Sequence, residues 1–281
     1  MNYSESVISF SCEGDHLIGI ASVPAEPTDC AVVIVVGGPQ YRIGSHRQFV
    51  LLARFLAQQG ITALRFDYRG MGDSTGALRD FAQIDNDLRA AVDALQNSNE
   101  KLKRIVLWGL CDAASAALFY AHQDARITGL VLANPWVRTV AGEAQAYLNH
   151  YYRSRLFNVS FWKKVLTGQF DFYGSLRSFI DTIKNAFLKR TSAGASPELP
   201  LREKMYYCWT KFTGNVLLII SGEDLTAKEF TDMVTSSAQW RTLLENSRVT
   251  THNFPMANHT FARADWRNEV NSVSANWIKS L

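Results

Sequence analysis

The chain has 281 residues, of which 47% are hydrophobic and 20% are charged, so it can form a packed core and is unlike a disordered segment. Its formal net charge of +3 is too small to argue for a nucleic-acid partner. We find no apolar run of the roughly 18 to 20 residues that a membrane span needs, and the start, MNYSESVISF, does not resemble a signal peptide. The four cysteines are far apart and have no metal-ligand spacing, so we predict a cytoplasmic protein without a metal site.

Strand and helix patterns alternate through the first half of the chain. Strands are predicted at residues 7–12, 17–23, 31–36, 61–66, 105–108 and 130–133, and helices at 49–57, 88–95 and 112–122. The first two strands are joined by a short turn at Glu13-Gly14-Asp15, which favours an antiparallel pair. The later strand–helix–strand repetition predicts a parallel sheet with helices on both faces.

The pattern stops at Asn134-Pro135 and resumes at Val216. The second part has predicted strands at 216–220 and 248–253 and predicted helices at 230–244 and 265–278. We therefore predict one core made of residues 1–136 and 210–281, interrupted by an insertion at 137–209. Apolar residues in the insertion fall on one helical stripe, which is compatible with a lid over the site or with ordinary core packing: Leu176, Phe179, Ile180, Ile183 and Phe187.

The turn after the predicted strand 105–108 places a cysteine between small residues. Gly109 and Ala113 lie two positions before and after Cys111, as a sharp strand-to-helix turn with an exposed nucleophile requires. The start of the following helix favours a thiolate, because the helix dipole stabilises negative charge there. We predict that Cys111 is a nucleophile; the alternative is an inert buried thiol.

This turn makes the sequence resemble the α/β-hydrolase superfamily, whose pattern is G-x-nucleophile-x-G, with Cys111 as nucleophile and Ala113 in place of the second glycine. The resemblance implies an α/β-hydrolase fold, with a mostly parallel eight-stranded sheet, helices on both faces and a helical lid. The segments GGPQYRIGSHR, GLCDAASA and SGEDLTAKEF further resemble the hydrolases associated with exosortase (PEP-CTERM sorting) loci, which are usually encoded beside exopolysaccharide and protein-sorting genes.

The resemblance also implies a catalytic triad in the order nucleophile, acid, histidine. The histidine is His259, which follows the last predicted strand. Asp224 is favoured as the acid because the shorter side chain dominates this position in the superfamily, and Glu223 is the alternative. A rival acid position after the strand 130–133 is occupied by Asn134, which favours the later pair.

An oxyanion hole is expected from main-chain N–H groups. Asp112 would supply one donor, and Gly38 or Gln40 the other, because Pro39 has no N–H. A carboxylate at Asp112 opposes ionisation of the neighbouring thiol, so its side chain should point away or pair with Arg42 or Arg69.

Basic residues near the expected entrance form a substrate mouth in this interpretation: Arg42, His46 and Arg47. Together with the basic insertion they favour an anionic substrate or a transient contact with a membrane surface. Nothing suggests a nucleotide or flavin, so we expect no cofactor. The oligomeric state has no sequence signal.

These residues predict an enzyme that cleaves or transfers an acyl group from an ester or thioester through a covalent acyl-enzyme. The substrate would be a small or lipid-like acyl compound. The alternative is a non-catalytic scaffold of the same fold that binds a partner through its basic lid.

Overall fold

A computed structural model describes residues 2–38, 40–99, 101–138 and 199–281. Contacts divide the chain into two units, one formed by Met1–Val137 and Arg202–Leu281 and the other by Arg138–Leu201. The first unit resumes at Arg202 rather than at residue 210, where we expected the core to resume. The apolar stripe of the predicted lid lies outside the described residues.

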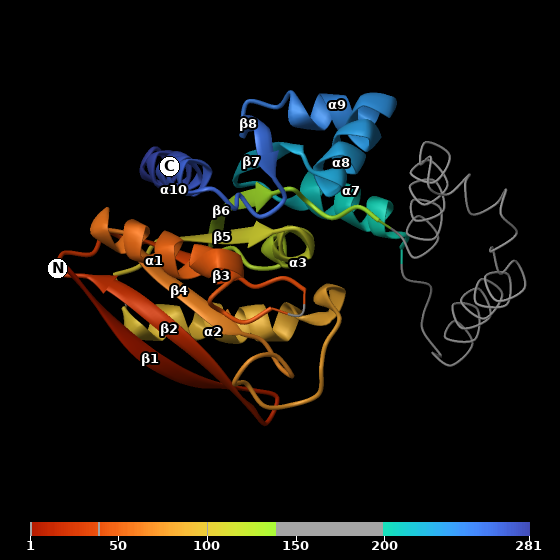
Figure 1. Ribbon diagram of the computed structural model, residues 1–281. Helices are drawn as coiled ribbons and strands as arrows, with labels where there is room; N and C mark the ends of the chain where they lie inside the picture. Colours follow the sequence, from red (N-terminus) through yellow and green to blue (C-terminus); the bar gives the residue numbers. More distant parts are fainter. Residues whose placement is uncertain (1, 39, 100, 139–198) are drawn as a thin grey trace, which may run out of the picture. The chain divides into compact units, whose positions relative to one another are not determined.

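The described residues form one eight-stranded sheet in the order β1-β2-β4-β3-β5-β6-β7-β8 (Figure 1). Its strands are β1 (Tyr3–Cys12), β2 (Asp15–Pro24), β3 (Cys30–Val35), β4 (Thr62–Asp67), β5 (Arg104–Leu110), β6 (Ile127–Ala133), β7 (Asn215–Glu223) and β8 (Val249–Asn258). The pairs β1/β2 and β2/β4 are antiparallel and the other neighbouring pairs are parallel. The prediction of a mostly parallel eight-stranded sheet is confirmed.

Helices cover both faces of the sheet because its central strands are apolar on both sides. Every residue of β3 is buried. Val32 and Ile34 pack in one cluster with α1 (Gln48–Gln58) and α10 (Ala264–Lys279). The remaining helices are α2 (Asp85–Ser98), α3 (Asp112–Ala121), α7 (Leu201–Lys211), α8 (Leu225–Ser236) and α9 (Ala238–Leu244), with short 3₁₀ turns at Ser45–Arg47 and Phe81–Gln83.

The order of the predicted elements is confirmed, with two differences. The helix expected over 230–244 is two helices, α8 and α9, because Ser237 adopts an extended backbone between them. The helix α7 was not predicted, because its sequence was assigned to the insertion. None of the helices that the structure describes is long and apolar enough to cross a membrane.

Candidate active site

Cys111 lies in the sharp turn between β5 and α3. Its backbone has φ of 65°, a left-handed conformation that strains a residue other than glycine. Neighbouring chain holds it there: the Cys111 N–H donates to the carbonyl oxygen of Ala133 at 2.9 Å, and the Cys111 carbonyl accepts from the N–H groups of Ala114 at 3.1 Å and Trp136 at 3.2 Å. The turn therefore presents the thiol at the carboxyl edge of the parallel strands, where open α/β sheets bind ligands.

Gly109 allows this turn because α3 passes very close to it. A Cβ atom at Gly109 would lie 2.5 Å from the carbonyl oxygen of Ala113, well inside van der Waals contact. Ala113 itself is fully buried. The small residues on either side of Cys111 thus have the steric role that the sequence predicted for them.

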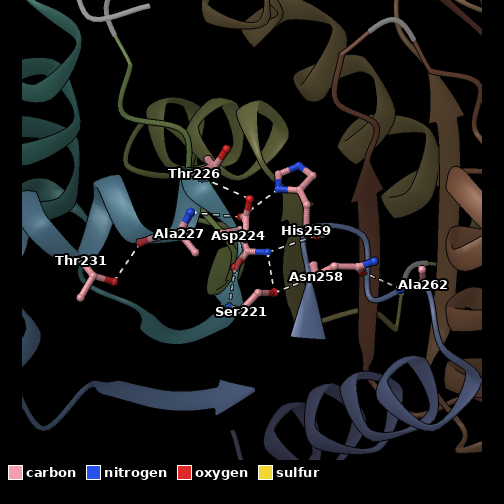
Figure 2. Close-up of polar contacts among 9 residues, drawn as sticks. Ser221, Asp224, Thr226, Ala227, Thr231, Asn258, His259 and Ala262 are labelled. Carbon is pink, nitrogen blue, oxygen red and sulfur yellow. Dashed lines mark hydrogen bonds and ion pairs between the residues drawn. The ribbon is translucent and has the colours of Figure 1, made fainter. Parts of the chain in front are cut away.

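Asp224 joins the end of β7 to the start of α8 and holds His259 (Figure 2). Its carboxylate accepts hydrogen bonds from the N–H groups of Thr226 at 3.2 Å and Ala227 at 3.1 Å, and so caps α8. Its Oδ2 lies 2.9 Å from Nδ1 of His259, which comes from the loop after β8. Glu223 is exposed, so the structure brings Asp224 and not Glu223 to the histidine.

The electrostatics of this pair favour a protonated imidazole. Burial opposes ionisation of Asp224, but the hydrogen bond with His259 and the two N–H groups of α8 outweigh it and lower the pKa of the carboxyl group. The pKa of His259 is raised to about 10, first by the hydrogen bond with Asp224 and second by the Cys111 thiol. The predicted acid and histidine are therefore joined by a hydrogen bond, and the role of Cys111 beside them stays a prediction.

Asn134 and Ser221 form a buried polar pair behind His259 that sequence reasoning missed. Asn134 Nδ2 donates to the main-chain oxygen of His259 at 3.1 Å and to Oγ of Ser221 at 2.9 Å. Its Oδ1 accepts the N–H of Ser221 at 2.8 Å, and Ser221 Oγ donates to the carbonyl of Asn258 at 3.1 Å. The predicted rival acid position thus holds an amide that fixes the backbone of the histidine loop.

Two of the N–H groups considered for the oxyanion hole, those of Gly38 and Gln40, already have hydrogen-bond acceptors. Gly38 N–H donates to Oδ2 of Asp112 at 2.8 Å, and Ala113 N–H donates to Oδ1 at 2.9 Å. Gln40 N–H donates to the carbonyl of Gly38 at 2.8 Å. Burial raises the pKa of Asp112, although the N–H groups of Gly38, Ala113 and Asp112 itself act in the opposite direction. The carboxylate of Asp112 therefore binds one of the N–H groups that we expected to face an oxyanion, that of Gly38.

Neither arginine expected to pair with Asp112 does so. Arg42 forms ion pairs with Asp67, which is fully buried, and with Asp73. Arg69 is bound to Asp87 and Glu13. The two arginines therefore pair with acidic residues in and around the turn after β4, and neither pairs with Asp112.

The residues of the predicted substrate mouth differ in their surroundings. The Arg42 guanidinium is bound in two ion pairs, and its side chain is only 11% exposed. Its charge is therefore not available to a ligand, contrary to our prediction. His46 and Arg47 are exposed in the 3₁₀ turn, with left-handed φ values of 53° and 60°. Their role as mouth residues stays a prediction.

The other cysteines differ from Cys111 in burial. Cys12, Cys30 and Cys208 are buried, and burial raises the pKa of each thiol to about 11, whereas Cys111 is partly exposed. In the described ranges we find no group of three or more His, Cys, Asp or Glu side chains that could hold a metal ion.

Comparisons with known proteins agree with the architecture. The family model Hydrolase_4, described as serine aminopeptidase S33, matches residues 27–169, just over half of the chain. No curated protein matches the chain. The fold is similar to that of esterase Pf2001 from Pyrococcus furiosus, with 18% identity, 99% of this chain and 93% of that chain covered, and a TM-score of 0.67.

Two further solved structures share the fold. A dienelactone hydrolase from Anabaena variabilis has 16% identity and a TM-score of 0.64, with 100% of this chain and 99% of that chain covered. A cold-adapted esterase from an Arctic intertidal metagenomic library has 17% identity and a TM-score of 0.62, with 100% and 94% covered. The similar structures show the α/β-hydrolase fold, and the family model, which matches more than half of the chain, shows that the chain belongs to the Hydrolase_4 (serine aminopeptidase S33) family of hydrolases.

Proposed function

We propose that this hydrolase cleaves or transfers acyl groups from esters or thioesters with Cys111 as its nucleophile. The observation that carries the proposal is the position of His259, which is hydrogen-bonded to Asp224 at 2.9 Å and whose imidazole pKa is raised in part by the Cys111 thiol at the sharp turn. Acyl transfer needs a nucleophile, a base and a group that orients the base, and we assign these roles to the partly exposed Cys111, to His259 and to Asp224. The name of the matched family implies a serine, so a cysteine at this turn sets this chain apart.

The chemistry follows from these contacts. His259 takes the thiol proton as the sulfur attacks, and the raised pKa of its imidazole favours the protonated ring. The Cys111 sulfur then forms a bond to the acyl carbon, the bond from that carbon to the leaving oxygen or sulfur breaks, and His259 returns its proton to the leaving group. Attack on the thioester by water, or by another alcohol, amine or thiol, releases the acyl group and the free Cys111.

Asp224 supports both steps by holding Nδ1 of the ring, so that Nε2 is the nitrogen that exchanges the proton. Esters are the substrates named for two of the structural neighbours, and we propose small or lipid-like acyl esters and thioesters for this chain on that analogy. An exosortase-associated role and a reducing, cytoplasmic location are part of the same proposal. The four free cysteines suit such a location.

A non-catalytic scaffold is the second candidate function. The contact of Asp112 with Gly38 N–H favours it, because a hydrolase needs that N–H for the reaction. A scaffold would leave Cys111 unacylated by any activated ester, so the two candidates separate in one measurement.

The test is incubation of the protein with p-nitrophenyl acetate and with acetyl-coenzyme A. We expect an acetyl mass addition on Cys111 and turnover of at least one compound. Cys111→Ala should abolish both, and Cys111→Ser should keep a trace of turnover. Cys208→Ala is the matched control, since it removes a buried thiol elsewhere and should leave acylation intact. Full activity in Cys111→Ala would show that the proposed mechanism is wrong.

A further inference from the structure

The carboxylate of Asp112 engages an N–H group that the sequence predicts for the oxyanion hole. It accepts the Gly38 N–H at 2.8 Å and the Ala113 N–H at 2.9 Å. Gly38 and Asp112 are residues whose N–H groups the sequence predicts as oxyanion donors. The carboxylate of Asp112 thus takes the Gly38 hydrogen bond that would stabilise an oxyanion of the substrate.

The loop after β3 is shaped around this carboxylate. A Cβ atom at Gly37 would lie 2.1 Å from Oδ1 of Asp112, so only glycine leaves space for the side chain in this position. At the next residue, Gly38, a Cβ atom would lie 3.9 Å from Oδ2 of Asp112, an ordinary van der Waals contact. Within the described residues Asp112 forms no ion pair, and the main-chain N–H groups are what hold it. The arrangement is therefore built into both segments of the chain.

We infer that Asp112 keeps the oxyanion hole closed by occupying it, and that its carboxylate must leave the Gly38 N–H before an acyl oxygen can bind. This inference rests on the proposed function. Asp112 then competes with the substrate and decides which acyl compounds react, because each compound has to replace hydrogen bonds between N–H groups and a charged oxygen. Losing one such donor typically slows a reaction by about a hundredfold, so opening the hole should accelerate acylation by about ten- to a hundredfold.

The experiment compares the wild type with Asp112→Asn and Asp112→Ala. Both variants remove the negative charge beside Cys111, but only alanine vacates the hole, since the asparagine oxygen still accepts the Gly38 N–H. Acylation is followed as the burst of p-nitrophenolate from p-nitrophenyl acetate. Intrinsic thiol reactivity is followed with methyl methanethiosulfonate, whose attack by the thiolate releases methanesulfinate, forms a methyl disulfide and places no charge on a carbonyl oxygen.

We expect thiosulfonate rates at Cys111 to be equal in Asp112→Asn and Asp112→Ala. The ratio of the acylation rate to the thiosulfonate rate should be lowest in wild type, higher in Asp112→Asn and highest in Asp112→Ala. We expect the ratio in Asp112→Ala to be about ten- to a hundredfold above that of wild type. Equal ratios in all three proteins, or a lower ratio in alanine, would overturn the inference. Circular dichroism and thermal unfolding establish that the variants are folded.

A second readout separates this inference from the proposed function. In Cys111→Ala protein, the amide proton resonance of Gly38 should move upfield when Asp112→Ala removes its carboxylate acceptor, and less so with Asp112→Asn. An unchanged resonance would overturn the occupied hole whatever the enzyme does. If no variant acylates Cys111 while the Gly38 resonance moves as expected, the proposed function fails and Asp112 is shown to fill the hole of a scaffold.

Discussion

The side-chain amide of Asn134, at the end of β6, donates a hydrogen bond to the main-chain oxygen of His259 at 3.1 Å. Asn134 is fully buried and has φ of 45°, so the surrounding chain holds it in a strained conformation. Its other hydrogen bonds fix Ser221 on the neighbouring strand β7. The histidine loop is thereby fastened to two strands of the sheet by one side chain.

Replacing this amide should loosen the imidazole. Asn134→Ala leaves the buried N–H of Ser221 without its acceptor, which should lower the free energy of unfolding by about 2 kcal/mol. A shifted His259 should lower kcat by about tenfold or more with little change in KM, because small misplacements of catalytic groups are costly. Urea unfolding and steady-state kinetics with a p-nitrophenyl ester measure both effects.

Ser221→Ala is the matched control for this prediction. It removes the hydroxyl that contacts Asn258 but keeps the hydrogen bond from Asn134 to His259. We expect a smaller effect on kcat than in Asn134→Ala at comparable loss of stability. A kcat of Asn134→Ala equal to that of Ser221→Ala would show that Asn134 has no special hold on the histidine.

The raised pKa of His259 predicts how stability depends on pH. The folded protein holds the proton more tightly than the unfolded chain, whose ordinary value is 6.5, so the stabilisation is fully present below about pH 6.5. It is lost as pH rises through about 10, the value in the folded protein. Since the imidazole is about one-third exposed, solvent screens the interaction, and we expect it to contribute about 1 kcal/mol to the free energy of unfolding.

The measurement is urea unfolding of wild type and His259→Asn at pH 6, 8 and 10. The difference in the free energy of unfolding should be largest at pH 6 and smallest at pH 10. Cys111→Ala serves as control: it removes the second contribution to the raised pKa, so the loss should occur at lower pH. A difference that grows toward pH 10 would contradict the assigned protonation.

Arg42 should matter for stability rather than for substrate affinity. Its partner Asp67 is fully buried, so Arg42→Ala leaves an unpaired buried charge and should destabilise the fold by about 3 kcal/mol. Arg47→Ala is the control at an exposed position, where we expect a change within about 0.5 kcal/mol. A raised KM for anionic esters with unchanged thermal stability in Arg42→Ala would restore its role at the substrate mouth.

Gly37 and Asp112 should be coupled energetically. Gly37→Ala places a Cβ 2.1 Å from the Asp112 carboxylate and should be destabilising, whereas in an Asp112→Ala background that clash is gone. We expect a coupling of about 1 to 2 kcal/mol in a double-mutant cycle from chemical denaturation. The clash at 3.0 Å with Ala113 remains in both backgrounds and so does not enter the coupling. Additive effects would mean that the carboxylate does not rest against Gly37.

The predictions that rest on local sequence agree with the structure for a physical reason. A short, continuous β-branched run such as residues 31–36 is typical of a strand buried on both faces, and the strand Cys30–Val35 is buried throughout. The turn at Cys111 needs small neighbours within two positions, and these are visible in the sequence itself. Local patterns of this kind carry their own structural constraint.

What the sequence left open depends on contacts between distant segments. Asp112 could have turned toward either of two arginines, and its actual partner, the Gly38 N–H, lies 74 residues away in the chain. The hold of Asn134 on the loop of His259 spans 125 residues. The pattern of hydrophobic residues along the chain does not predict hydrogen bonds between such distant residues. Each residue type is compatible with many environments until the strands lie side by side.

The point where the first unit is interrupted has a consequence for how such a protein can vary. β6 pairs directly with β7, and Arg202 Nε donates to the carbonyl of Val137 at 3.3 Å, so the chain leaves and re-enters at almost the same place. The pairing of β6 with β7 joins residues on either side of these two anchors. A change in the length of the chain between Val137 and Arg202 therefore need not alter the register of these two strands.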